Sequence, residues 1–91
     1  MADGQSTSAR CRPGKTLAVV TTLAHDKGYV LALDGHGRTI FCYTTNFETM
    51  GKYDCFDCRL GTSLCLTVIE DSKRYHQQVL YRGIEIEVVA R

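Results

Sequence analysis

The sequence has no tryptophan, one proline and almost no net charge, and these scarcities limit what the chain can be. Eleven basic and ten acidic side chains leave a formal net charge of +1. That balance excludes a histone-like polycation and an acidic tail, but it allows a nucleic-acid binder with a local basic patch. No stretch approaches the roughly eighteen apolar residues that a membrane span needs. The opening residues, MADGQSTSAR, lack the apolar run of a signal peptide, so we expect a cytoplasmic protein, with the nucleus as the alternative compartment.

The length of 91 residues and the hydrophobic fraction of 44% are typical of one small globular domain. Residues 1–13 are small, polar and glycine-containing, which predicts a disordered leader. Residues 14–91 are then the folded domain, which we expect to be monomeric.

The folded part shows the alternation and the β-branched residues of strands rather than a helical period. Strands are predicted over 16–23, 29–33, 39–45, 63–70 and 79–89, with turns at 25–28, 34–37 and 71–74. Asn46 is placed to cap one helical turn, and Gly83 predicts a bulge or bend in the last strand. Five strands with a long third connection predict an all-β protein, a closed barrel of the oligonucleotide/oligosaccharide-binding (OB) type. A β-sandwich and an SH3-like or Tudor barrel are the alternatives.

Five cysteines are an odd number, and without a signal peptide they do not predict a disulfide framework. Cys55 and Cys58 have the CxxC spacing of zinc knuckles and redox motifs, but only Cys65 and the more distant His76 could complete a zinc site. We therefore expect reduced thiols with no metal and no cofactor. Glu85 and Glu87 have no accompanying nucleophile, so no enzyme activity and no catalytic residue are predicted.

Two segments, DKGYVL at 26–31 and TIFCY at 39–43, resemble the cold-shock domain, a family of the OB-fold superfamily. That family carries a lysine-glycine-aromatic segment on its second strand and an aromatic segment on its third. Both expose rings on which single-stranded bases stack. Lys27, Gly28 and Tyr29 match the first segment, Phe41 matches the second, and Tyr43 replaces the usual histidine.

The chain also departs from the family pattern, so it resembles a divergent cold-shock domain. Val30 and Leu31 stand where the family has glycine and an exposed phenylalanine, and Thr22 stands near its tryptophan. Since each stacked base contributes about 1–3 kcal/mol, the resemblance implies weak binding of single-stranded RNA, or alternatively DNA. The second hypothesis is a protein-interaction module on the same barrel that has lost nucleic-acid binding.

Strand periodicity predicts which side chains form this surface. Residues two apart on a strand share a face, so Val30, Ala32, Ile40 and Cys42 are expected to point inward. The candidate nucleic-acid-binding residues are Tyr29, Phe41 and Tyr43 for the bases and Lys15, Lys27 and Arg38 for the phosphates. The opposite interpretation, with Tyr29 and Phe41 in the core, remains open from the sequence.

Overall fold

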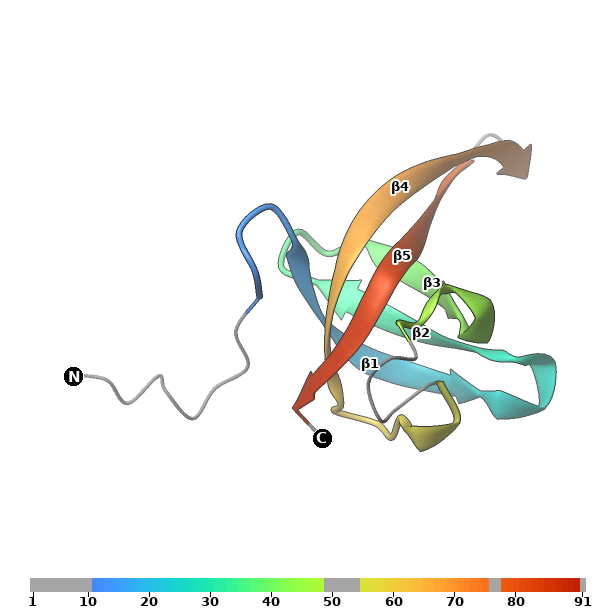
Figure 1. Ribbon diagram of the computed structural model, residues 1–91. Helices are drawn as coiled ribbons and strands as arrows, with labels where there is room; N and C mark the ends of the chain where they lie inside the picture. Colours follow the sequence, from blue (N-terminus) through green and yellow to red (C-terminus); the bar gives the residue numbers. More distant parts are fainter. Residues whose placement is uncertain (1–10, 49–54, 76–77, 91) are drawn as a thin grey trace.

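A computed structural model describes residues 11–48, 55–75 and 78–90 of the chain. Its five strands are β1 (Thr16–Ala24), β2 (Tyr29–Asp34), β3 (Thr39–Tyr43), β4 (Ser63–Tyr75) and β5 (Gln78–Ala90). They form a closed barrel in the order β1-β2-β3-β5-β4 (Figure 1). The first three strands pair antiparallel, β3 pairs parallel with β5, and β4 closes the barrel by pairing with β1. The predicted all-β, OB-fold-like barrel is therefore confirmed.

The barrel is filled by the inward side chains that alternation predicts. Val30, Ala32, Ile40 and Cys42 are all 0% exposed, so the predicted inward set is confirmed. From the opposite wall, Leu64, Leu66 and Ile86 complete a core of small aliphatic residues and cysteines. Within the described ranges, no helix is both long and apolar enough to cross a membrane.

The short turns around the barrel are tight 3-10 turns, and the connection after β3 differs from expectation. The turn η2 (His25–Lys27) lies at the predicted place and ends at Gly28, whose φ of 84° is in the left-handed region that glycine tolerates. The third strand ends at Tyr43, and η3 (Thr44–Asn46) takes the place of its predicted last residues. The helical turn predicted after Asn46 is wrong, because Phe47 is extended, buried and bridged to β5 at Ile86.

The turn predicted at 71–74 is also wrong, because β4 continues to Tyr75. Asp71 pairs with Leu80, and Tyr75 pairs with Gln78. The far parts of β4 and β5 thus form a two-stranded ribbon that extends away from the barrel (Figure 1). Cross-strand pairing keeps this polar stretch extended, and a single-chain pattern does not contain that information.

The bulge in β5 lies at Glu85 rather than at Gly83. Gly83 stays in register opposite Val68, whereas the register shifts between Cys65 and Thr67 on β4, opposite Glu85. Glu85 has a φ of 51°, a left-handed conformation typical of a bulged residue. A Cβ at Gly83 would lie 3.0 Å from a Leu66 methyl group, so a larger residue here would require the Leu66 side chain to shift.

Candidate nucleic-acid interface

The register of β2 against β3 brings three aromatic side chains together on the outer face of the barrel. Tyr29 lies opposite Tyr43, and Leu31 lies opposite Phe41. The ring of Tyr29 is 5.6 Å from that of Phe41 and 5.5 Å from that of Tyr43, between centroids. The Phe41 and Tyr43 rings are 6.2 Å apart and inclined by only 18°. We call these three residues the aromatic cluster.

The aromatic cluster belongs to the surface of the barrel and not to its core. Tyr43 is 38% exposed, and Tyr29 and Phe41 are half-buried. Val30, which follows Tyr29, and Cys42, which lies between Phe41 and Tyr43, point to the opposite side of the sheet and are fully buried. Partial burial of neighbouring rings against one another holds them in place while leaving part of each ring accessible. A fixed, partly exposed group of rings is what base stacking requires.

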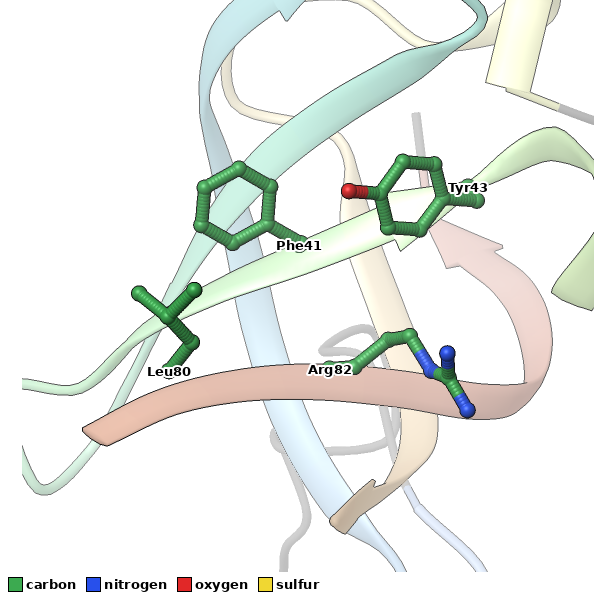
Figure 2. Close-up of a pocket in the computed structure, with 4 residues that line it drawn as sticks. All are labelled: Phe41, Tyr43, Leu80 and Arg82. Carbon is green, nitrogen blue, oxygen red and sulfur yellow. The ribbon is translucent and has the colours of Figure 1, made fainter. Parts of the chain in front are cut away.

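Arg82 of β5 borders the aromatic cluster, and sequence reasoning missed it. It lies opposite Phe41 in the parallel β3–β5 pair. Arg82 and Leu80 line a small pocket with Phe41 and Tyr43, and Figure 2 shows the arginine side chain running along β5 on the side of Tyr43, with Leu80 on the side of Phe41. The Arg82 Nε is buried and has no hydrogen-bond partner among the described residues. This places a cationic side chain next to the rings.

Arg38 lies at the β2–β3 hairpin and is already paired. Its Nε donates to Asp34 Oδ2 at 2.6 Å, and its guanidinium lies 5.1 Å from the centre of the Tyr81 ring. Asp34 Oδ1 also accepts hydrogen bonds from the backbone N–H groups of His36 and Arg38, both at 2.9 Å. Burial alone would raise the pKa of Asp34, but these hydrogen bonds and the Arg38 charge hold that pKa below its usual value. Arg38 therefore stabilises the hairpin.

The two predicted lysines differ in their surroundings. Lys27 is exposed in η2, two residues before Tyr29, and so lies near one end of the aromatic cluster. Lys15 is placed elsewhere: its Nζ donates to Glu85 Oε1 at 3.0 Å and to the Glu85 backbone oxygen at 3.2 Å. That contact lowers the pKa of Glu85 and pairs the lysine with a carboxylate of opposite charge.

The two cysteines of the CxxC pair are buried in the core. Cys55 and Cys58 are 0% and 1% exposed and belong to the same core cluster as Cys42. Burial raises the pKa of the Cys42 thiol to about 12, with a smaller effect from the neighbouring Cys58 and Cys55. No group of three or more histidine, cysteine, aspartate or glutamate side chains is arranged to hold a metal ion in the part of the chain that the structure describes.

A separate apolar groove lies on the outer face of β1 and β2. Leu17, Val19 and Leu33 are 39%, 39% and 43% exposed and line an open groove of about 490 Å³. Val19 and Leu33 are paired across the two strands, as Leu31 is with Phe41. Leu33, Leu31 and Tyr29 alternate along β2, so the groove and the aromatic cluster lie on the same outward side of this strand.

The fold and the site together define a small OB-like barrel with an exposed aromatic cluster and an adjacent arginine on its β2–β3–β5 face. The chain matches no known family model, and no curated protein is significantly similar to it.

Proposed function

We propose that this protein binds single-stranded nucleic acid on the aromatic cluster, with RNA as the preferred ligand. The observation that carries the proposal is the grouping of Tyr29, Phe41 and Tyr43 with centroids 5.5–6.2 Å apart on the outer face, bordered by Arg82. Each ring can receive a base, because stacking needs only an accessible aromatic face. The preference for RNA rests on the resemblance of 26–31 and 39–43 to the cold-shock family.

The expected affinity follows from the size of the cluster. Two or three stacked bases contribute about 1–3 kcal/mol each, and the ordering of a flexible strand opposes them. Arg82, whose Nε has no hydrogen-bond partner among the described residues, and the exposed Lys27 add a modest electrostatic contribution. A dissociation constant in the micromolar range or weaker is expected, which corresponds to a binding free energy of about −8 kcal/mol or a less negative value.

Fluorescence anisotropy with labelled pyrimidine and mixed-sequence single strands, of RNA and of DNA, tests the proposal at low and moderate salt. Phe41→Ala should weaken binding by one stacked base, roughly tenfold, while the barrel stays folded. Leu33→Ala is the matched control, because it truncates an exposed side chain on the same face outside the aromatic cluster. Absence of binding by the wild-type protein at low salt, or equal affinity of Phe41→Ala and wild type, would refute the proposal.

The second candidate function is a protein-interaction module, and the apolar groove is the observation that favours it. Exposed leucine and valine side chains in a continuous groove offer apolar area to a partner and nothing that recognises phosphate. In that case the single strands fail to bind, and substitutions at Leu17 and Leu33 rather than at Phe41 weaken capture of the partner.

A further inference from the structure

The segment before β1 covers a cysteine on the outside of the barrel. Leu64 and Leu66 of β4 point into the core, so Cys65 between them points outward. Its β1 neighbour in the register, Leu17, is 39% exposed, yet Cys65 is only 1% exposed and is not part of the core cluster. Something outside the barrel must therefore bury Cys65.

The cover is residues 11–15, which we call the N-terminal segment. Cys11 is half-buried, and the neighbouring Cys65 is one of the groups that raise the pKa of its thiol. Arg12 Nη2 donates to Glu87 Oε2 at 3.0 Å, and Glu87 is the register partner of Cys65 on β5. Lys15 adds its pair with Glu85 and closes the turn through its backbone N–H, 3.0 Å from the Arg12 oxygen. These two ion pairs hold the N-terminal segment, and Cys11 with it, over the part of the outer face where Cys65 lies.

We infer that Cys11 and Cys65 are a disulfide-forming pair that links the N-terminal segment covalently to β4 when a small-molecule disulfide is present. This inference is independent of the proposed function. Three further cysteines, Cys42, Cys55 and Cys58, lie in the core cluster and have no such position on the outer surface.

The chemistry is two successive thiol–disulfide exchanges with glutathione disulfide as the oxidant. The half-buried Cys11 loses its proton, and its thiolate attacks one sulfur of glutathione disulfide, releasing the first glutathione thiolate. The Cys65 thiolate then attacks the Cys11 sulfur of the mixed disulfide and releases the second glutathione. Two cysteine thiols are oxidised, one glutathione disulfide is reduced to two thiols, and the two protons pass to the leaving thiolates.

The pH dependence of the first exchange has a definite direction. Burial, followed by the hydrogen bond and the charge of Cys65, raises the pKa of the Cys11 thiol to about 12. Only the thiolate reacts, and below this pKa its population grows with pH. The rate of linkage should therefore increase roughly tenfold for each pH unit between 7 and 9.

The test treats the reduced full-length chain with glutathione disulfide, quenches with acid and maps the cysteines by mass spectrometry without reduction. We expect an intact mass lower by two hydrogen atoms, a peptide pair joined through Cys11 and Cys65, and a melting temperature higher by roughly 10 °C or more that dithiothreitol reverses. Cys11→Ser and Cys65→Ser should each lose the link and the shift. Cys11→Ser alone is sufficient should Cys65→Ser fail to fold, because Cys11 lies outside the core.

A glutathione adduct that remains on Cys11 without linkage to Cys65 would overturn the inference. So would a melting-temperature rise that survives in Cys11→Ser, because another pair of cysteines would then be responsible. Cys58→Ala is the matched control: it removes a core thiol and should leave the link between Cys11 and Cys65 intact.

Discussion

Two outer faces of the same barrel differ in whether their basic side chains form ion pairs with carboxylates. On the β4–β5 face, Arg12 and Lys15 of the N-terminal segment pair with Glu87 and Glu85, both at 3.0 Å. On the β2–β3–β5 face, Arg82 lies beside the aromatic cluster, and its Nε has no hydrogen-bond partner in the part of the chain that the structure describes. Both faces belong to one closed sheet, so the difference comes from what covers each of them.

A side-chain cation attracts an anionic ligand more strongly where the fold does not already pair it with a carboxylate. A cation held 3.0 Å from a carboxylate contributes little to the attraction of a phosphate, because the opposite charge cancels its field. Net charge, +1 for the whole chain, does not reveal this difference. The proposed contact with nucleic acid is therefore expected at Arg82 and the aromatic cluster rather than at Arg12 and Lys15.

The largest effect is expected from the pair of neighbouring residues that separates inside from outside. Ile40→Ala removes a fully buried side chain and should destabilise the fold by about 2–5 kcal/mol, enough to unfold a domain of this size. Phe41→Ala, one residue on, should cost less stability and mainly affinity for single strands. Thermal melting followed by circular dichroism measures both. If Phe41→Ala is as unstable as Ile40→Ala, the Phe41 ring contributes to stability as a core residue does, and its assignment to a binding surface is wrong.

The next effect concerns the hairpin that positions the aromatic cluster. Asp34→Asn removes the charge that accepts from Arg38 and weakens the turn, which should cost about 2–3 kcal/mol at neutral pH. The pKa of Asp34 is lowered on folding, so its contribution is complete above the ordinary aspartate pKa and is lost as the pH falls through the lowered value. Denaturation of both proteins from pH 7 to pH 2 should show the gap in stability closing at the acid end. A gap that stays constant with pH would contradict this role of the carboxylate.

A smaller effect, confined to binding, is expected from Arg82→Met, which keeps an apolar stem over β5 but removes the charge. Affinity for single strands should fall roughly five- to tenfold, and the slope of log K against log salt should decrease by about 0.7, one phosphate contact. Anisotropy titrations at several salt concentrations measure both quantities. An unchanged slope would mean that Arg82 does not meet a phosphate.

The smallest effect is expected from Lys15→Met, the matched substitution on the covered face. Lys15 is already paired with Glu85, so the affinity for single strands and the slope of log K against log salt should remain those of the wild type. The same titrations serve as the measurement. A loss equal to that of Arg82→Met would remove the distinction between the two faces.

Much of the barrel could be predicted because its determinants are local. The inward alternation of Val30, Ala32, Ile40 and Cys42 and the turns after β1 and β2 depend on residues a few positions apart. The aromatic cluster follows from the same periodicity once the short hairpin pairs β2 with β3. The length of β4 and the bulge at Glu85 could not be predicted, because pairing with β5 decides them.

The sequence by itself determined the strand periodicity, the five-stranded β class and the alternation that sets Tyr29, Phe41 and Tyr43 apart from Val30 and Cys42, since side-chain alternation is a property of the strand alone. Which of the two sets faces outward was decided by closure of the barrel. Only the tertiary structure decided that Arg82 joins those rings, that Lys15 pairs with Glu85 and that Cys11 covers Cys65. Each of these contacts joins residues about forty or more positions apart. Closure of the barrel brings these residues together, and a local sequence pattern does not predict which distant residue will lie next to a given position.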